Sequence, residues 1–328
     1  MAVLGNSLSE VITDTFEENV LEGLSSQPKH LSSKYFYDKT GDELFVEITK
    51  LPEYYLTDAE NEIFNDQRAE ILEAFKLNMQ KTEIVELGAG DGHKAAFLLA
   101  PLRSKDNVEF APVDISQNTL NVVVERFKRE IPELRVRPIP GEYFSVLTSL
   151  NPDRRKIVLF LGSNIGNLNQ KQASNFINRL STTLKKGDML LLGVDLKKSA
   201  DIILPAYNDS SGVTKKFNLN LLHRINRELG GNFDVTKFTH DPEYDEIEGE
   251  ARSYIKSLED QHVFIDSLHK SFYFKKEERI HTEISQKYDD KKVHDICSAS
   301  GLEIIKKFTD KRGYFADYLL EKTNLSDN

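Results

Sequence analysis

The segment Thr82-Glu-Ile-Val-Glu-Leu-Gly-Ala-Gly-Asp-Gly92 decides the fold class of this chain. Its first half is a short apolar run, which predicts a buried strand, and its glycines predict a tight turn that leads into a helix. Further runs rich in Val, Ile and Leu follow, each separated from the next by an amphipathic segment. This alternation is typical of βαβ units, so we expect an α/β fold with a parallel sheet covered by helices on both faces.

The expected elements extend this pattern in both directions along the chain. Strands are expected at Glu83–Leu87, Val108–Val113, Leu134–Pro138, Ile157–Leu161 and Met189–Val194. Helices are expected near residues 93–103, 117–130, 143–150, 170–185 and 198–206. Upstream, an amphipathic helix is expected over 8–24, and Thr57-Asp-Ala-Glu60 predicts a capping box that opens a helix to about Leu77. Downstream, we expect a helix at Asn218–Leu229 among antiparallel strands, a helix at Asp289–Ser298 and a closing strand pair at Leu302–Phe308 and Tyr314–Leu320.

The composition limits the possible partners. The 328 residues include 43 Lys and Arg against 53 Asp and Glu, and the formal net charge of −10 disfavours nucleic acid and acidic membrane surfaces. A single cysteine, Cys297, excludes an intramolecular disulfide and a cysteine metal cage, and it indicates a reducing compartment. With no leader or membrane span in the pattern, we expect a cytoplasmic protein, a monomer by default, whose partner is a small molecule. The acidic run Asp241–Glu250 lacks the spacing of a calcium loop, and a solvated loop is expected there.

The glycine-rich turn indicates the kind of ligand. Its Gly88-x-Gly90-x-Gly92 spacing differs from the Gly-x-Gly-x-x-Gly of pyrophosphate binders. Glu86 at the strand end would repel a diphosphate and would suit a cationic ligand. These features favour S-adenosylmethionine, whose sulfonium is positive, over a nicotinamide dinucleotide. A plain strand-to-helix turn is the alternative.

The ends of the next two strands supply further candidates. Asp114 closes the second strand, where a carboxylate can accept both ribose hydroxyls, and the alternative role of helix N-cap is served by Ser116 or Gln117. After the third strand, Glu142 could accept the adenine amino group and Tyr143 could stack on the base. With the glycine-rich turn, these residues indicate a class I methyltransferase with a Rossmann-like sheet.

The fourth strand is followed by Gly162-Ser-Asn-Ile-Gly-Asn167. Two glycines and polar amides directly after an apolar run favour a floor on which the methyl acceptor lies. The Asn167 amide can donate to a carboxylate and accept from an amine. A plain capping loop is an equal alternative for this segment alone.

Ten collinear motifs resemble those of one family, the histidine-specific Nα-methyltransferases of ergothioneine biosynthesis. They run in order from about Tyr35 to the C-terminus. The motifs are Phe36-Tyr37-Asp38-x-x-Gly41, Leu51-Pro-Glu-Tyr54-Tyr55-x-Thr57, Glu86-Leu-Gly-x-Gly, Pro112-Val-Asp114-Ile-Ser, Phe160-Leu-Gly-Ser-x-Ile-Gly-Asn167-Leu, Leu192-Gly-x-Asp195, Ala206-Tyr207-Asn-Asp209-x-x-Gly212-Val-Thr, Phe217-Asn-x-Asn220, Ile225-Asn-Arg-Glu-Leu229 and Thr282-Glu283-x-Ser285-x-Lys287.

The resemblance implies a cofactor, a reaction and a set of site residues. The methyl donor would be S-adenosylmethionine, and the α-amino group of histidine would be methylated up to three times to give hercynine. The residues that would hold the cofactor are Gly88 and Gly90 of the glycine-rich turn, Lys94, Asp114, Glu142 and Tyr143, the last two standing where the family usually has Asp-Phe. The residues that would bind the substrate are Tyr54, Asn167 and Tyr207 at its amino and carboxylate groups, Tyr37 close to the amine, and Glu283 and Ser285 at the imidazole.

Two of these expectations depend on local chemistry. Residues i and i+2 of a strand share a face, so Glu283 and Ser285 could meet both ring nitrogens, although without the resemblance they would be expected on a solvent face. Tyr37 and Tyr54 could orient the amine or pass its proton to water, and direct loss of the proton to water is at least as plausible because a tyrosine pKa lies near 10.

One position departs from the family in a way that bears on specificity. Gly249, in Ile247-Glu-Gly-Glu-Ala-Arg252, stands where the family usually has methionine against the substrate side chain. Glycine would enlarge the pocket and could admit a bulkier amino acid such as tryptophan, whereas retention of Glu283 argues for histidine because an indole would leave that carboxylate unpaired. The alternatives are therefore the same chemistry on another amino acid or small amine, or a non-catalytic S-adenosylmethionine-binding protein.

Four segments are expected from these assignments. Residues 1–80 would form a helical arm that contributes to the substrate pocket, and 81–212 would form the cofactor-binding domain. Residues 213–290 would form a smaller α+β cap that binds the substrate, and 291–328 would close the sheet.

Overall fold

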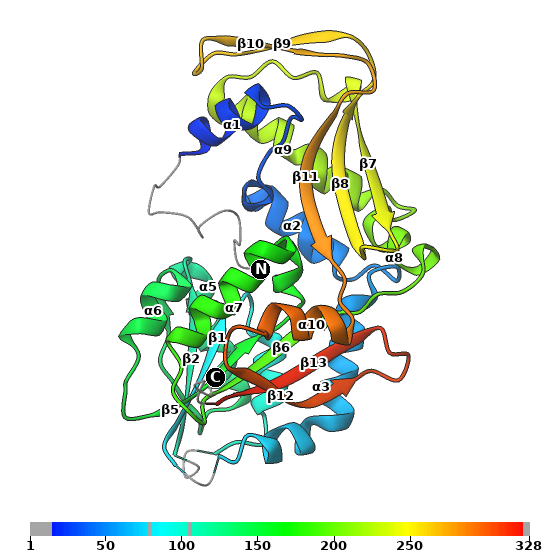
Figure 1. Ribbon diagram of the computed structural model, residues 1–328. Coiled ribbons are helices and arrows are strands. Elements are labelled where there is room, and N and C mark those ends of the chain that lie inside the picture. The colour runs from blue at the N-terminus through cyan, green and yellow to red at the C-terminus, as the bar shows by residue number, and fades with distance from the viewer. Residues whose placement is uncertain (1–14, 78–79, 104–106, 324–328) are drawn as a thin grey trace. The chain divides into compact units, whose positions relative to one another are not determined.

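The computed structural model describes residues 15–77, 80–103 and 107–323. These residues form two compact units, each with its own secondary structure (Figure 1). The first, called the sheet unit, contains residues 56–197 and 287–323, and the second, called the α+β unit, contains residues 15–55 and 198–286.

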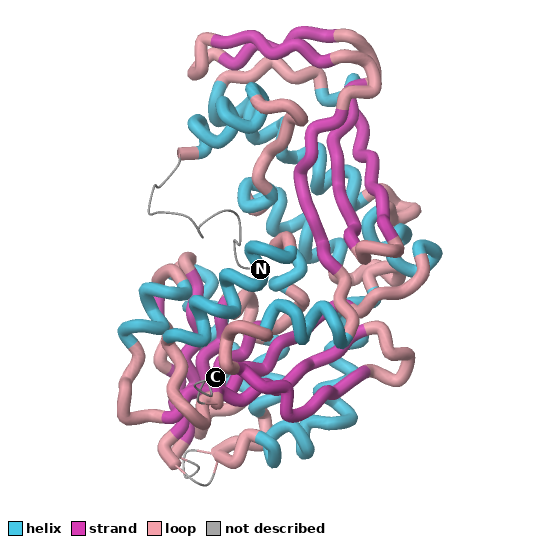
Figure 2. Tube along the Cα trace, in the orientation of Figure 1, coloured by secondary structure: helices cyan, strands magenta, loops and turns pink. Residues whose placement is uncertain are grey.

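The sheet unit is built on one eight-stranded sheet (Figure 2). Its strands are β1 (Thr82–Leu87), β2 (Val108–Asp114), β3 (Arg135–Val136), β4 (Ile139–Pro140), β5 (Arg155–Phe160), β6 (Met189–Asp195), β12 (Leu302–Thr309) and β13 (Phe315–Lys322). They lie in the order β12-β13-β6-β5-β1-β2-β3, with β4 also paired to β2. The strands from β1 to β6 pair in parallel, and β13 is antiparallel to both β6 and β12.

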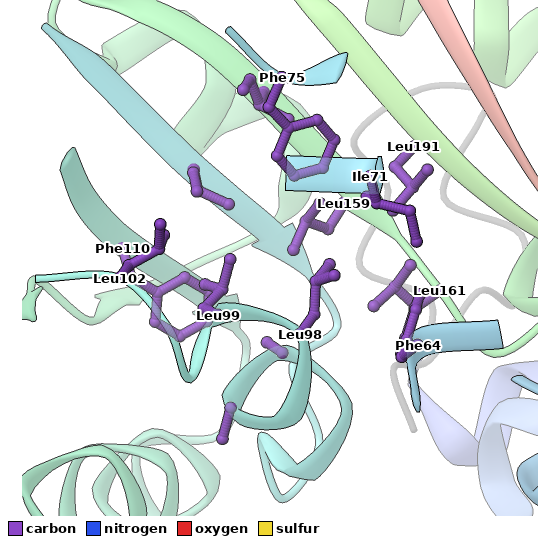
Figure 3. Packing of buried hydrophobic residues seen from close by; sticks show 14 of the residues in the cluster. Phe64, Ile71, Phe75, Leu98, Leu99, Leu102, Phe110, Leu159, Leu161 and Leu191 are labelled. Carbon is purple, nitrogen blue, oxygen red and sulfur yellow. The ribbon is translucent and has the colours of Figure 1, made fainter. Parts of the chain in front are cut away.

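Helices cover both faces of this sheet, which explains why the residues of its central strands are buried without alternation. The helices of the sheet unit are α3 (Tyr55–Ala74, whose first residue is counted with the α+β unit), α4 (His93–Leu99), α5 (Gln117–Glu130), α6 (Tyr143–Ser149), α7 (Gln170–Thr182) and α10 (Asp290–Cys297). Residues of α3, α4 and α5 share one apolar core with every second residue of the strands, including Leu159 and Leu191 (Figure 3). On the opposite face, Phe176 of α7 stacks on Phe160 of β5 with ring centroids 4.8 Å apart.

The order and type of the predicted elements from β1 to β6 are confirmed, with one interruption. The strand expected at Leu134–Pro138 is instead two short pieces, β3 and β4, which pair with β2 in the same register on either side of Pro138. Proline lacks the N–H group that a continuous ladder needs, so it breaks this edge strand.

Two predicted helix starts are corrected. The capping box at Thr57-Asp-Ala-Glu60 is wrong, because α3 begins at Tyr55 and these residues lie inside the helix. The helix expected over 8–24 corresponds to α1 (Phe16–Ser25), and residues 8–14 lie outside the described part of the chain. The N-cap of α1 is Thr15, which forms a capping box with Glu18.

The α+β unit combines helices with two small antiparallel sheets. Its helices are α1, the 3-10 helix η1 (Ser33–Phe36), α2 (Lys39–Ile48), α8 (Ala200–Tyr207), α9 (Val213–Leu229) and the 3-10 helix η4 (Val235–Lys237). Strands β7 (Phe238–Asp245), β8 (Glu250–Ser257) and β11 (Arg279–Gln286) form one sheet, and β9 (Gln261–Ile265) pairs with β10 (Lys270–Phe274). Buried and half-exposed residues alternate along β8, which is the period of a strand with one covered face.

The solvated loop expected at Asp241–Glu250 is wrong. Asp241 and Glu243 lie in β7, and only the turn from 246 to 249 separates β7 from β8. Arg279 contacts both carboxylates, at 2.6 Å from Asp241 and 2.8 Å from Glu243. Basic side chains on the neighbouring strands therefore compensate the acidic run, which allows it to pair as a strand.

The units divide the chain differently from the four expected segments. Residues 56–77 belong to the sheet unit because Ile63, Phe64 and Ile71 of α3 enter its core. Residues 198–212 belong to the α+β unit, where Asp209 accepts hydrogen bonds from the first amides of α9, Val213 N and Thr214 N. None of the described helices is long and apolar enough to cross a membrane.

Candidate active site

The middle of the large sheet provides the first half of the candidate site. From β1 the chain continues to β2 and β3 on one side, whereas β5 and β6 lie on the other, so the strand order reverses between β1 and β5. In open α/β sheets, ligands bind outside the carboxyl ends of the strands at such a switch point. The segments after these two strands are the glycine-rich turn, Gly88–Gly92, and the loop Gly162–Asn167.

The glycine-rich turn has a backbone that favours glycine. Gly88 and Gly90 have φ values of 73° and 53°, in the left-handed region where a side chain is unfavourable. Gly88 N donates to Val113 O at 2.9 Å, which ties the turn to the end of β2. A turn without side chains lets a ligand approach the backbone closely.

Asp114 ends β2 beside this turn and is buried. Its carboxylate accepts a hydrogen bond from Ser116 N at 2.9 Å, and a second comes from the amide of Gly90. Burial raises the pKa of Asp114, and these backbone hydrogen bonds oppose the rise. The N-cap of α5 is Ser116, as expected, which accepts from Thr119 N. The carboxylate of Asp114 is therefore not occupied in capping.

Glu142 and Tyr143 open α6 with different exposure. Glu142 is exposed at the N-cap position and makes no capping hydrogen bond with its side chain. Tyr143 is buried with its ring edge-on to Phe160, at 6.3 Å between centroids. Burial raises the pKa of the Tyr143 phenol well above its ordinary value, and Asp114 adds to the rise.

Two buried polar atoms test whether a nucleoside with a cationic group fits this end of the sheet. Among the described residues, Glu86 Oε2 and the Tyr143 hydroxyl have no hydrogen-bond partner. Buried polar groups are normally satisfied, so unpaired ones at a switch point indicate a place for a ligand that carries hydrogen-bond donors. Adenosine and the methionyl part of S-adenosylmethionine offer such donors, and the residues present therefore fit this cofactor.

Lys94 lies on α4, where its ammonium forms an ion pair with Glu60 of α3. Burial raises the pKa of Glu86 well above its ordinary value, and the charge of Lys94 opposes that rise. Lys94 is therefore the positive charge that compensates the buried acids at this end of the sheet. Glu60 was not among the predicted site residues, although it interrupts the apolar stripe that includes Ala59, Ile63 and Phe64.

Asn167 belongs to the sheet unit, whereas the other predicted substrate residues belong to the α+β unit. It is the last residue of the 3-10 helix η3 (Asn164–Asn167). The capping role in this loop is taken by Asn169, which forms a capping box with Gln172 at the start of α7. Asn167 is thus not needed as a helix cap.

The α+β unit brings Tyr207 and Ser285 together. The hydroxyl of Tyr207, the last residue of α8, donates to Ser285 Oγ on β11 at 2.7 Å. Glu283 and Ser285 lie opposite Ser253 and Ala251 of β8, so both project from the same face of the sheet. Ser285 is buried and Glu283 is half-buried, which excludes a fully solvated face for this pair.

Tyr37 and Tyr54 belong to one aromatic cluster. Their rings flank Phe45 of α2, with centroid distances of 5.9 Å from Tyr37 and 6.3 Å from Tyr54. Phe217 of α9 lies 5.7 Å from Tyr37 and completes the cluster. Phe45 was not predicted as a site residue, since a single Phe on an amphipathic helix carries no signal beyond packing.

Tyr37 is also electrostatically linked to Glu283. Removal from solvent raises the pKa of the Tyr37 phenol well above its ordinary value, and the negative charge of Glu283 adds to the rise. Tyr37 therefore stays protonated at neutral pH, where it can donate or accept a hydrogen bond but cannot act as a phenolate base.

Gly249 has a structural role in the β7–β8 hairpin. Its φ is 68°, and its N–H donates to Asp245 O at 2.7 Å across the turn. Its carbonyl accepts a hydrogen bond from Gln286 Nε2 at 3.0 Å, and Gln286 adjoins Ser285. The turn thus favours glycine for its backbone and lies next to the strand that carries Glu283 and Ser285.

A buried histidine supports Tyr207 and was not predicted. His240 Nε2 lies 2.8 Å from the backbone oxygen of Tyr207, and burial lowers the pKa of His240. Because a carbonyl oxygen can only accept, Nε2 carries a hydrogen and donates this hydrogen bond. Its signal in the sequence was weak, because His240 directly precedes the acidic run Asp241–Glu250 that was expected to be a loop.

Among the described residues, no group of three or more His, Cys, Asp or Glu side chains is arranged to hold a metal ion. Cys297 is buried, and burial raises the pKa of its thiol to about 12. Its sulfur is therefore a protonated, packed group at neutral pH.

Comparison with known proteins assigns the family. A family model described as histidine-specific methyltransferase, S-adenosylmethionine-dependent, matches residues 16–322. This chain belongs to that family. The family assignment agrees with the class I strand order of the sheet. It also agrees with S-adenosylmethionine as the cofactor that fits the carboxyl ends of the strands.

Three named relatives align with nearly the whole of this chain. The histidine N-alpha-methyltransferase of Mycobacterium tuberculosis (strain CDC 1551 / Oshkosh) is 36% identical over 93% of this chain and 94% of its own length. The protein of the same name from Mycolicibacterium smegmatis is 34% identical over 92% and 93%. An L-tryptophan methyltransferase of Psilocybe serbica is 25% identical over 98% and 97%.

Proposed function

We propose that this methyltransferase transfers the methyl group of S-adenosylmethionine to the α-amino group of L-histidine, up to three times, giving hercynine. The family and the names of the mycobacterial relatives support this substrate. The structural observation that carries it is the pair Glu283 and Ser285 on one face of β11, with Ser285 hydrogen-bonded to Tyr207. A carboxylate and a hydroxyl side by side match the two nitrogens of an imidazole ring.

The sheet unit supplies the proposed cofactor residues. The backbone of Gly88 and Gly90 would approach the ligand, and the carboxylate of Asp114 would accept from the ribose hydroxyls. Glu142 would accept from the adenine amino group and the ring of Tyr143 would pack on the base. S-adenosylmethionine supplies an electrophilic methyl group on a cationic sulfur, and the buried acid Glu86 suits that positive charge.

The amino acid would be held by its carboxylate and its side chain. Tyr54, Tyr207 and Asn167 are the proposed contacts of the amino and carboxylate groups, and Glu283 with Ser285 is the proposed contact of the imidazole. Because the carboxylate and imidazole contacts do not use the amine, its N–H groups could be replaced by methyl groups while the amino acid stays bound. Holding the nitrogen at near-attack distance is the main contribution that such a site makes to a displacement reaction.

Tyr37 would orient the amine rather than remove its proton. Its phenol stays protonated because solvent exclusion and Glu283 raise its pKa. A protonated phenol can accept a hydrogen bond from the ammonium form or donate one to the free amine. The amine proton would then be lost to water before methyl transfer.

A second candidate function is the same chemistry on tryptophan. Gly249 and the name of the Psilocybe serbica relative favour it. Glu283 opposes it, because an indole has one N–H donor and would leave the carboxylate incompletely satisfied beside the Tyr37 hydroxyl. We therefore propose histidine as the preferred substrate.

The test is to incubate the protein with S-adenosylmethionine and each amino acid separately, and to record mass gains of one, two or three methyl groups. Histidine is expected to gain up to three. Glu283→Ala is expected to lower kcat/KM for histidine by about 100-fold, since a charged hydrogen bond is worth about 1.5–3 kcal/mol. Glu303→Ala, which removes an exposed carboxylate from β12, is the control and should change nothing.

Two outcomes would contradict the proposal. If another amino acid is methylated and histidine is not, the histidine assignment is lost. If no amino acid gains mass while calorimetry still detects S-adenosylmethionine binding, the chain is a cofactor-binding protein without this activity.

A further inference from the structure

Glu60 is a fully buried carboxylate at the cofactor end of the large sheet. It lies on α3 among apolar neighbours, and its side chain is 0% exposed. One oxygen, Oε1, accepts a hydrogen bond from Gly162 N at 2.8 Å, and the other pairs with the ammonium of Lys94. Glu60 thus connects α3 with the start of the loop after β5 and with α4.

Asp317 of β13 faces the same place. It pairs in register with Gly193 of β6, and its side chain is also 0% exposed. A Cβ atom added to Gly193 would lie 2.6 Å from Glu60 Oε1 and 3.0 Å from Asp317 Oδ1. The two carboxyl groups therefore approach each other over Gly193, in space that any larger residue would fill.

The two acids, Glu60 and Asp317, face a single positive charge, the ammonium of Lys94. Neither oxygen of Asp317 has a hydrogen-bond partner among the described residues, and the charged groups that act on it are Glu60 from α3 and Lys94 from α4. Its strand neighbours Gly193 and Phe308 carry no charge. Two carboxylates cannot both stay ionised in a dry site beside one ammonium without a large cost, so one of them holds a proton.

The hydrogen bonds decide which acid holds the proton. Glu60 accepts from an amide and pairs with Lys94, which favours its ionised form, whereas Asp317 has neither kind of stabilisation. Burial raises the pKa of Asp317 well above its ordinary value, Glu60 adds to the rise and Lys94 opposes it. The direction of this shift agrees with the geometry.

We propose that Glu60 and Asp317 are positioning residues for methyl transfer. Asp317 is buried as a neutral acid, which leaves the single ammonium of Lys94 paired with Glu60. Glu60 in turn fixes the Gly162 amide and the Lys94 side chain at the carboxyl ends of β5 and β1. The effect on catalysis rests on the proposed function, whereas the effect on cofactor binding does not.

The position of Lys94 explains why this pair would matter. Its side chain is 25% exposed while its partner Glu60 is 0% exposed, so Lys94 is anchored on the buried side and accessible on the other. A Cβ atom on Gly162 would lie 2.9 Å from Lys94 Nζ, which shows that the ammonium packs directly against this loop. Moving Glu60 would therefore displace two segments at the switch point together.

The test measures S-adenosylmethionine affinity of the full-length protein by calorimetry, a readout that needs no amino-acid substrate. Glu60→Gln keeps an acceptor for Gly162 N but loses the ion pair, and it is expected to weaken binding at neutral pH by about tenfold or more. Glu62→Gln, on the same helix and with its carboxylate paired with the exposed Lys311 at 3.4 Å, is the control and should bind as wild type does.

Asp317→Asn separates positioning from simple packing. Asparagine imitates the neutral acid and cannot ionise, so its affinity should stay within about twofold of wild type at neutral pH. In wild type, affinity should fall at alkaline pH as Asp317 ionises and competes for Lys94, and this fall should be absent in the variant. Infrared difference spectra of wild type minus Asp317→Asn should show a protonated carboxyl group.

Three results would overturn the proposal. One is unchanged affinity in Glu60→Gln, and another is the absence of a protonated carboxyl signal in the difference spectrum. The third is an alkaline profile that is the same in wild type and Asp317→Asn. Thermal unfolding of each variant, measured in parallel, separates a loss of fold from a loss of binding.

Discussion

At the scale of single residues, two buried acids lie at the ligand end of the large sheet. Glu86 follows Ile84 and Val85 near the end of β1, and Asp317 interrupts Phe315-Ala-Asp-Tyr-Leu-Leu320. Burying either group costs more than any packing it provides, so its presence needs another cause. Glu86 was predicted as a ligand-facing acid from its place before the glycine-rich turn, whereas Asp317 lay in a strand with no motif and was missed.

Gly249 supports a prediction about both stability and specificity. Because its φ is 68°, Gly249→Ala should lower the free energy of unfolding by about 1–2 kcal/mol, measured by urea denaturation. If the missing side chain also widens the substrate pocket, the variant should lower kcat/KM for tryptophan relative to histidine. An unchanged ratio together with lower stability would assign Gly249 to the turn alone. Ala251→Gly is the control. It also changes one methyl group, but it does so on β8, at a position with ordinary strand conformation.

At the scale of elements, period and spacing predicted most of the chain correctly. The parallel strands β1, β2, β5 and β6 were found because each contains a short run rich in Val, Ile, Leu or Phe between amphipathic helices. Strand β7 was missed because its acids suggested solvent, while the residues that compensate them, such as Arg279, lie far along the chain. Pairings between distant strands are set by tertiary contacts, which local composition does not reveal.

The contact between β7 and the end of α8 supports a pH prediction. Burial lowers the pKa of His240 in the folded protein, so the unfolded chain binds a proton more readily. Stability from this group is present above its ordinary pKa of 6.5 and is lost as the pH falls below that value. His281, whose pKa burial also lowers, contributes in the same direction.

His240→Asn should reduce this acid sensitivity, and it should raise KM for histidine more than it lowers kcat, because Tyr207 would lose part of its support. Urea denaturation at about pH 7 and about pH 5.5 measures the first effect, and steady-state kinetics measures the second. The same loss of stability with acid in wild type and variant would show that His240 is protonated or solvated in the folded state.

At the scale of the whole molecule, strand order was enough to select the candidate cofactor residues, whereas it did not select the candidate substrate residues. Gly88, Asp114 and Tyr143 lie at the ends of consecutive strands, and strand order alone places such residues at one edge of a sheet. Apart from Asn167, the candidate substrate residues come from four separated parts of the chain within the α+β unit, near 37–54, 207, 249 and 283–285. Motif resemblance selected them, and periodicity would not have done so.

The buried acids also predict how stability changes with pH. The folded chain keeps protons on Asp317 and Glu86 at pH values where the unfolded chain releases them, because burial raises both pKa values. The stability that these two groups contribute is fully present below their ordinary pKa values, 3.8 for Asp and 4.5 for Glu. It is lost as the pH rises through their raised pKa values. Asp317→Asn should therefore become more stable relative to wild type as the pH increases from about 5 to about 9, measured by urea denaturation. A constant difference across that range would show that Asp317 is already ionised when folded.

The proposed function depends on Glu283 and Ser285, which we propose select histidine as the methyl acceptor. It is tested most directly by offering wild-type protein equal concentrations of histidine and tryptophan with S-adenosylmethionine, and measuring both methylated products by mass spectrometry at early times. We predict an excess of methylated histidine of at least about 100-fold, and a much smaller excess in Glu283→Ala. Equal products from the wild-type protein, or an excess of methylated tryptophan, would contradict the account.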